Sequence, residues 1–235
     1  MRILITGTDS GVGKTWVGCA LALALQSVGK QVVAVKPLET GCSGAPGDRE
    51  DGVLLAQATG QAQPTHAIFR MPEQLPPTLA SDRSGITIDF DALVLRIERY
   101  AERAEYLLVE GVGGLLLPMT WEWNMVDVAR ALGASAIVVG VDRLGSINHI
   151  LLTLSALELA GVPCAGVVLT TPERADQSTG SNAAAIARLS GLERVVAAPR
   201  TAYPDRTEAM RTVVGWLSRV PAGGRMDGWT AGRLG

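Results

Sequence analysis

The sequence has little of what marks a disulfide-rich, metal-binding or membrane protein. Among 235 residues there are three cysteines, Cys19, Cys42 and Cys164, and their spacing fits no common metal site. An odd thiol would remain if two of them paired, so we expect reduced, buried cysteines and a reducing compartment. No apolar run reaches the ~18 residues of a membrane span, and no secretory signal is visible. The sequence therefore predicts a soluble, cytoplasmic protein.

The sequence also lacks an excess of charge. Its formal net charge is -2, which gives no electrostatic reason to expect nucleic acid or an anionic membrane as a partner. The composition is 47% apolar and includes 27 glycines. Such a composition suits a buried sheet joined by tight turns.

Short β-branched runs alternate with longer segments of helical period. The expected strands are ILI, QVVAVK, YLLVE, SAIVVGV, CAGVVLT and RVVAA, and the expected helices cover 13–28, 89–103, 147–160, 182–189 and 206–219. Because the strands are continuously apolar, they predict an α/β fold with a doubly wound, mainly parallel sheet flanked by helices. We expect one domain over residues 1–220 and a flexible tail at 221–235.

The first expected strand runs into the loop GTDSGVGKT, from Gly7 to Thr15. Such glycine-rich loops turn backbone N–H groups toward phosphate oxygens, Lys14 can reach the β- and γ-phosphates, and the Thr15 hydroxyl can ligate magnesium. The strict pattern G-x-x-x-x-G-K-[ST] requires glycine where this sequence has Thr8. The loop predicts a P-loop NTPase-like nucleotide site of an unusual kind.

Charged residues follow other expected strands, at the sheet edge where ligands of such folds collect. Lys36 ends QVVAVK. An isolated lysine is more often solvated, but a place at the same sheet edge as the loop favours a lysine that neutralises charge on a transferring phosphoryl group. Glu110 ends YLLVE and could hold magnesium or be a buried structural carboxylate. Asp48, Glu50 and Asp51 precede a short helical run, so at least one should cap a helix and one could reach the metal.

Three other residues are harder to assign. His149 opens a helix in LGSINHILLT and has no evident orienting partner, which favours a structural histidine over a catalytic base. Trp121 and Trp123 lie after Glu110 and could line a substrate pocket or pack in a core or interface.

Taken in order, GTDSGVGKT, KPLETG, EDGVLL, LVEGVGG and LGSINHILLT resemble dethiobiotin synthetase, the ATP-dependent enzyme family of biotin biosynthesis. These segments span residues 7–153. The family's loop begins Gly-Thr-Asp with one residue more than the strict pattern, which matches the position of Thr8. The resemblance implies a deviant P-loop fold, ATP and Mg²⁺ as co-substrate and cofactor, and a homodimer.

By position, the resemblance implies a role for each matching residue. Lys36 would be catalytic, supported by Lys14. The metal would lie among Thr15, Asp51 and Glu110. Nucleotide contacts would come from Gly11, Val12, Gly13, Lys14, Thr15, Trp16, Asp51, Glu110, Gly111, Val112, Gly113, Thr170, Thr171, Pro199, Arg200 and Thr201. Substrate contacts would come from Thr8, Thr40 and Gly114, and, from the partner subunit, Gly145, Ser146, Ile147 and Asn148.

The implied reaction joins 7,8-diaminononanoate and CO₂ at the expense of ATP, through a carbamate and a carbamic-phosphoric anhydride. The sequence departs from the family in a few places. Gly11 stands where some members have glutamate, and Thr170-Thr171 follow a strand where many members place an asparagine that reads adenine.

Two other classes share parts of these motifs. One is another amide-forming P-loop synthetase, which usually carries a further glutaminase domain. The other is a partitioning or septum-positioning ATPase, a nucleotide switch whose loop resembles KGGVGKT. Residues 8–10 here are Thr-Asp-Ser, without that extra lysine. The loop therefore favours the dethiobiotin synthetase interpretation.

Overall fold

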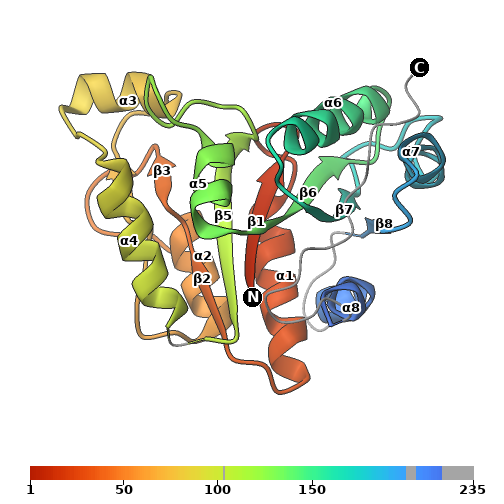
Figure 1. Cartoon of the computed structure of the whole chain (residues 1–235), viewed down its shortest axis with the longest axis horizontal. Coiled ribbons are helices and arrows are strands. Elements are labelled where there is room, and N and C mark those ends of the chain that lie inside the picture. The colour runs from red at the N-terminus through yellow and green to blue at the C-terminus, as the bar shows by residue number, and fades with distance from the viewer. Residues whose placement is uncertain (103, 200–204, 219–235) are drawn as a thin grey trace.

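The computed structural model describes residues 1–102, 104–199 and 205–218 (Figure 1). Strands and helices alternate along them. In chain order they are β1 (Arg2–Gly7), α1 (Lys14–Ser27), β2 (Val32–Val35), β3 (Leu38–Thr40), α2 (Asp51–Thr59), β4 (Phe69–Met71), α3 (Pro77–Ser84), α4 (Phe90–Ala101), β5 (Tyr106–Gly114), α5 (Met125–Leu132), β6 (Ser135–Val141), α6 (Ser146–Leu159), β7 (Cys164–Thr170), α7 (Asn182–Ser190), β8 (Val195–Ala198) and α8 (Asp205–Leu217).

Within the described residues, six strands form one parallel sheet in the order β2-β5-β1-β6-β7-β8. Strand β1 lies near the middle, with Ile5 opposite Glu110 of β5 and Ile137 of β6. Because all the strands run in the same direction, their carboxyl ends meet at one edge. The prediction of a doubly wound α/β fold is confirmed.

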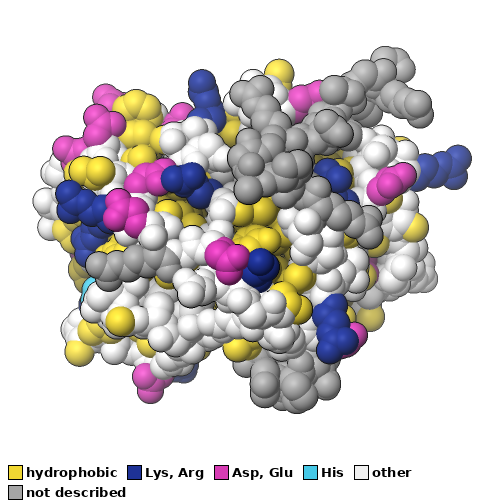
Figure 2. Space-filling view, turned by 60° about the horizontal axis from the view of Figure 1, so that its bottom comes forward, with side chains coloured by type: hydrophobic (Ala, Val, Ile, Leu, Met, Phe, Trp, Pro, Cys, Tyr) yellow, Lys and Arg dark blue, Asp and Glu magenta, His cyan; other side chains and the backbone are white. Residues whose placement is uncertain are grey.

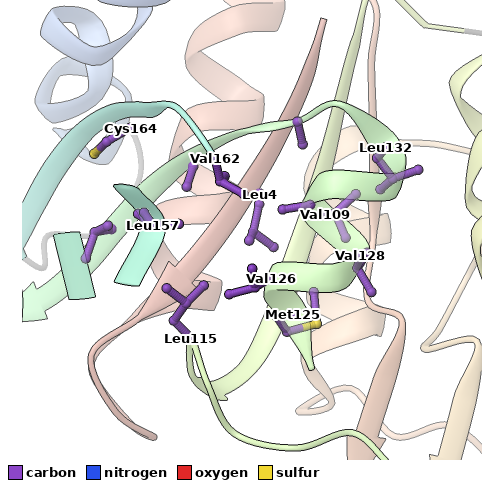
Figure 3. Close-up of a cluster of buried hydrophobic side chains, with 14 of the residues drawn as sticks. Leu4, Val109, Leu115, Met125, Val126, Val128, Leu132, Leu157, Val162 and Cys164 are labelled. Atoms are coloured by element: carbon purple, nitrogen blue, oxygen red, sulfur yellow. The ribbon is translucent and has the colours of Figure 1, made fainter. Parts of the chain in front are cut away.

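Helices cover both faces of this sheet, which explains the continuously apolar strands. Leu4 and Val109 point to one face, where they pack with residues of α4 to α7; Figure 3 shows this cluster, including Val126 of α5 and Leu157 of α6. Ile3 lies on the opposite face with residues of α1, α2 and α8. Each strand therefore buries side chains on both sides.

Several elements differ from the expectations. Strand β5 continues to Gly114, beyond the expected end at Glu110. Helices α3 and α5, and a small parallel sheet of β3 and β4, lie in segments where we expected no helix or strand. Helix α5 begins at a capping box in which Asn124 accepts a hydrogen bond from the Val126 amide at 2.8 Å and Asp127 accepts one from the Asn124 amide at 2.9 Å.

The tail predicted at 221–235 falls outside the described residues, and the single domain expected over residues 1–220 stays a prediction. None of the helices in the described part of the chain is long and apolar enough to cross a bilayer. On the face in Figure 2, acidic and basic side chains lie interspersed. This mixture agrees with the small net charge of the sequence.

Candidate active site

The phosphate loop joins β1 to α1 at the middle of the sheet edge. Gly13 has a φ of 95° and forms the N-cap of α1, a conformation that glycine adopts without steric cost. The Thr8 amide donates to Val139 O at 2.9 Å, and the Thr170 hydroxyl donates to Val12 O at 2.7 Å. Strands β6 and β7 thus brace the loop. The Thr170 side chain is fully buried in this contact, and its implied part in reading the base stays a prediction.

Lys14 begins α1 and reaches back across the loop. Its Nζ donates to the Asp9 carbonyl oxygen at 3.0 Å, and the residue is only 6% exposed. Burial, followed by repulsion from Lys36, lowers the pKa of Lys14 to about 8. A negatively charged phosphate nearby would stabilise the protonated form of this buried ammonium group.

Thr15, Asp51 and Glu110 come together from α1, α2 and β5. The Thr15 hydroxyl lies 2.7 Å from Asp51 Oδ1 and 2.9 Å from Glu110 Oε1, so it can donate its proton to either carboxylate. The structure therefore brings together the three residues that the resemblance implied as metal ligands.

Lys36 joins this group from the end of β2. Its Nζ lies 2.8 Å from Asp51 Oδ2 and 2.6 Å from Glu110 Oε1, and it donates to Gly111 O at 3.3 Å. Burial disfavours both charges, and it raises the pKa of Glu110 despite the nearby ammonium. Burial alone would lower the pKa of Lys36, yet the Glu110 and Asp51 carboxylates hold it above its ordinary value. Lys36 is therefore a fully charged cation at neutral pH.

The oxygen atoms of this group suit a hard divalent cation. Glu110 Oε2 is buried and has no hydrogen-bond partner among the described residues, which leaves one carboxylate oxygen unsatisfied. Carboxylate and hydroxyl oxygens are the donors that Mg²⁺ prefers beside nucleotide phosphates. The residues present therefore fit Mg²⁺.

A cavity of about 490 Å³ opens beside these residues. Residues with an implied role lie around it: Gly11, Lys14, Lys36, Thr40, Asp51, Val112 and Gly113. Further lining comes from residues that the motifs did not single out: Ser10, Glu39, Gln74, Leu75, Pro76, Pro77 and Leu117. The cavity joins the phosphate loop to the four-residue cluster of Thr15, Lys36, Asp51 and Glu110, hereafter the carboxylate cluster.

Known proteins with similar sequences share most of this chain. A family model described as "AAA domain" matches residues 1–206. The ATP-dependent dethiobiotin synthetase BioD of Anaeromyxobacter dehalogenans is 40% identical over 202 residues, which cover 84% of this chain and 89% of the relative. The chain belongs to the dethiobiotin synthetase family. A second synthetase, from another Anaeromyxobacter strain, is 40% identical over 81% of this chain and 86% of its own length.

Among solved structures, the cell division ATPase MinD of Pyrococcus furiosus resembles this synthetase fold. The TM-score is 0.54 with 15% sequence identity, over 92% of this chain and 98% of the other. At that identity the likeness shows the P-loop NTPase fold alone. The septum-positioning alternative gains no functional support from it.

A second cavity, of about 310 Å³, lies between the loop after β5 and helix α6. Thr8 and Gly114, both implied substrate contacts of dethiobiotin synthetases, line it together with Leu152 of α6. Gly114 is confined here, because an added Cβ would lie 3.2 Å from Thr8 O. The implied substrate residues Gly145, Ser146, Ile147 and Asn148 stand at the start of α6 and line neither cavity.

The remaining nucleotide residues implied by the synthetase motifs are more scattered. Trp16 packs partly buried against the cluster of α1 and α8, while Thr171 and Pro199 are exposed after β7 and β8. Arg200 and Thr201 lie outside the described residues.

The two tryptophans left unassigned lie near α3 and α4. Trp123 stacks on Phe90 with ring centroids 4.5 Å apart, and Trp121 is 72% exposed while its Nε1 donates to Asp82. Neither lines the 490 Å³ cavity.

One acidic residue of the site was not predicted from the sequence motifs. Glu39 is buried beside the carboxylate cluster and accepts hydrogen bonds from the amides of Asp51 and Gly52. Its only signal in the sequence is its place in KPLETG, three residues after Lys36. Glu50, which we considered as a cap or metal ligand, instead forms an ion pair with Arg70.

Proposed function

We propose that this protein is an ATP- and Mg²⁺-dependent dethiobiotin synthetase that converts 7,8-diaminononanoate, CO₂ and ATP into dethiobiotin, ADP and phosphate. The observation that carries the proposal is the meeting of Lys36 with Thr15, Asp51 and Glu110 beside the phosphate loop. Membership of the family supplies the substrate, and the site supplies groups suited to phosphoryl transfer.

The proposed chemistry has three steps. One substrate amine adds to CO₂, giving a carbamate and releasing a proton. A carbamate oxygen then attacks the γ-phosphorus, forming an O–P bond as the bond to ADP breaks. The second amine finally attacks the carbamoyl carbon, loses a proton, closes the ureido ring and expels phosphate. Each step can proceed without a nucleophile from the protein.

The protein's main task in this scheme is to hold two anions together. Carbamate and triphosphate repel one another, so fixed positive charge between them lowers the barrier. Lys14 and Lys36 both line the 490 Å³ cavity and provide two ammonium groups there. Lys14 is placed for the nucleotide phosphates, and Lys36 for the charge that develops between carbamate and γ-phosphate. The loop amides add further donors.

Thr15, Asp51 and Glu110 would hold Mg²⁺, with the unsatisfied Glu110 Oε2 as an available oxygen. When bound, the ion would neutralise phosphate charge and help to orient the triphosphate. Lys36 now forms ion pairs with the same carboxylates. Sharing Asp51 and Glu110 with a cation would loosen these ion pairs and leave the ammonium available to the substrate anions.

We also propose a homodimer that forms through helix α6. Leucines around this helix are unusually exposed: Leu144 by 80%, Leu152 by 62% and Leu159 by 90%, with Leu116 nearby at 60%. Apolar side chains gathered in this way favour burial against a partner. Since the residues at the start of α6 line neither cavity of their own subunit, a partner's substrate site would give them the role that the resemblance implies.

The cytoplasm is the compartment that we propose for this activity. Cys19, Cys42 and Cys164 are all buried, which suits cysteines of a protein in a reducing environment.

The test is phosphate release from Mg-ATP in the presence of bicarbonate, measured with and without 7,8-diaminononanoate, together with detection of dethiobiotin by mass spectrometry. We expect release to depend on both the diamine and bicarbonate, and product to form in a one-to-one ratio with phosphate. Phosphate release that is indifferent to the diamine would refute the proposed function. A diamine of similar length with terminal amines is the matched control, since it cannot close a five-membered ring.

A further inference from the structure

Helix α2 starts at the carboxylate cluster and lacks a cap from its own N-cap residue. Its first residue is Asp51, and the preceding Glu50 makes no side-chain hydrogen bond to the helix amides. The first amides of a helix need acceptors from elsewhere. An uncapped first turn would leave Asp51 on the least ordered part of the helix.

Glu39 supplies these acceptors from β3. Glu39 Oε1 accepts from the Asp51 amide at 2.6 Å, and Oε2 accepts from the Gly52 amide at 3.0 Å. The residue is only 9% exposed, so water competes little for these hydrogen bonds. A carboxylate at this end of α2 also interacts favourably with the helix dipole. The first turn is therefore fixed by a side chain from a separate strand.

Strand β4 also contacts the start of α2. Arg70 Nε and Nη2 donate to the two carboxylate oxygens of Glu50, at 2.7 and 2.6 Å. Arg70 lies opposite Glu39 in the register of β3 and β4. Glu39 of β3 thus binds the Asp51 amide, and Arg70 of β4 binds the side chain of the preceding residue, Glu50.

Close backbone packing leaves this turn little room to shift. A Cβ added to Gly52 would lie 2.3 Å from the Ala67 amide nitrogen, so the helix start rests directly on the chain that leads into β4. The same chain hydrogen-bonds to the end of β2, because the Ile68 amide donates to Lys36 O at 2.9 Å. The segments that carry Asp51 and Lys36 therefore both contact the chain that leads into β4.

We propose that Glu39 is a positioning residue that orients Asp51 for the metal by capping α2 from β3. This role rests on the proposed function, in which Asp51 holds Mg²⁺. Glu39 also lines the 490 Å³ cavity, but both of its carboxylate oxygens accept hydrogen bonds from the first amides of α2. It acts through the backbone of Asp51 and Gly52.

The test uses Mn²⁺ as a spectroscopic substitute for Mg²⁺. Mn²⁺ is titrated by electron paramagnetic resonance into the full-length protein saturated with β,γ-methylene-ATP, and the affinity for that nucleotide is measured separately in EDTA. Partners of metal ligands typically contribute 10–100-fold to metal affinity, so we expect Glu39→Ala to weaken Mn²⁺ binding about 10-fold or more. Its affinity for the metal-free nucleotide should stay at the wild-type value.

Glu39→Gln provides a conservative variant that is easier to fold. Its single carbonyl oxygen can accept from one of the two amides, so its loss of Mn²⁺ affinity should be smaller than that of Glu39→Ala. Asp89→Ala is the matched control, because Asp89 caps α4 by accepting from the Ala92 amide at 2.9 Å and lines neither cavity. It should lower the melting temperature and leave Mn²⁺ affinity unchanged.

The Asp51→Asn variant distinguishes a failure of the positioning role of Glu39 from a failure of the metal assignment of Asp51. Weaker Mn²⁺ binding in Asp51→Asn and in both Glu39 variants, with Asp89→Ala unaffected, supports the positioning role. If Asp51→Asn weakens binding but the Glu39 variants bind normally, the positioning role is wrong and the metal assignment stands. Equal losses in Asp89→Ala and Glu39→Ala would also overturn the role, since general destabilisation would then explain both. Normal binding in Asp51→Asn would overturn the metal assignment itself.

Discussion

Replacing Lys36 by methionine removes the ammonium group from the carboxylate cluster while keeping a side chain of similar length. Glu110 is 1% exposed and Lys36 is 3% exposed, so the variant leaves a buried carboxylate without its nearest cation. Removing one partner of a buried ion pair typically costs about 3–5 kcal/mol of folding free energy. We expect a loss of this size at neutral pH, together with loss of turnover.

The pH dependence of that loss gives a sharper test. Burial already raises the pKa of Glu110 and Lys36 opposes this, so the variant should raise it further. A carboxyl whose folded pKa is raised contributes stability below its unfolded pKa, and that contribution is lost as pH rises through the folded pKa. The Lys36 pKa is itself raised, so in the wild type its contribution is present at neutral pH and is lost only under strongly alkaline conditions. The deficit of Lys36→Met should therefore widen as the pH rises above the ordinary pKa of a glutamate side chain.

Urea titrations followed by tryptophan fluorescence at several pH values measure this deficit. Lys30→Met is the control, because Lys30 pairs with Glu105 on the surface, where both side chains are largely exposed. Its stability should match the wild type, since exposed ion pairs contribute little. A deficit below about 1 kcal/mol for Lys36→Met at neutral pH, or one that narrows as pH rises, would contradict the account of the buried pair. Near-normal turnover would contradict the catalytic role of Lys36.

Two further predictions concern Lys14 and α6. The pKa of Lys14 is lowered to about 8. Between this pH and the ordinary pKa of lysine, the folded state binds fewer protons than the unfolded state. Below about pH 8 the charged Lys14 therefore lowers the stability of the folded state. Lys14→Met should raise the free energy of unfolding at neutral pH by up to about 3 kcal/mol and abolish ATP binding, and lower stability in urea would contradict this. Leu152→Asp places a charge on the exposed side of α6 and should give a folded monomer by analytical ultracentrifugation. A variant that keeps the wild-type association state would refute the proposed interface.

Strand-end positions made much of the site predictable. A parallel sheet brings the carboxyl ends of its strands to one edge, so Lys14, Lys36 and Glu110 could be expected together before any geometry was known. The structure adds that Glu110 lies within β5 and not at its end, since the glycines that follow continue the strand. The position of Asp51 before a helix left it as one of three acidic candidates, and only the family resemblance singled it out. The structure adds its 2.7 Å contact with the Thr15 hydroxyl.

Other features of the fold and the site depend on contacts between distant segments, which leave only weak patterns in the local sequence. Strands β3 and β4 have three residues each, too few for a hydrophobic period, and they pair across a long insertion. The capping role of Glu39 exists only once that pairing has formed. Helix α5 could have been found from Asn124 and Asp127, whose spacing is that of a capping box, although the preceding tryptophan-containing segment suggested a loop.

The strand order also determines when the protein can become active during its synthesis. Strands β1 and β2 are neighbours in the sequence, yet β5 lies between them in the sheet. Thr15 contacts a carboxylate 95 positions further along the chain, and Lys36 contacts the same carboxylate 74 positions away. Such distant contacts form late, because the chain must close large loops first. A nascent chain that has not yet reached β5 therefore carries the phosphate loop and Lys36 without Glu110, the carboxylate that both Thr15 and Lys36 contact.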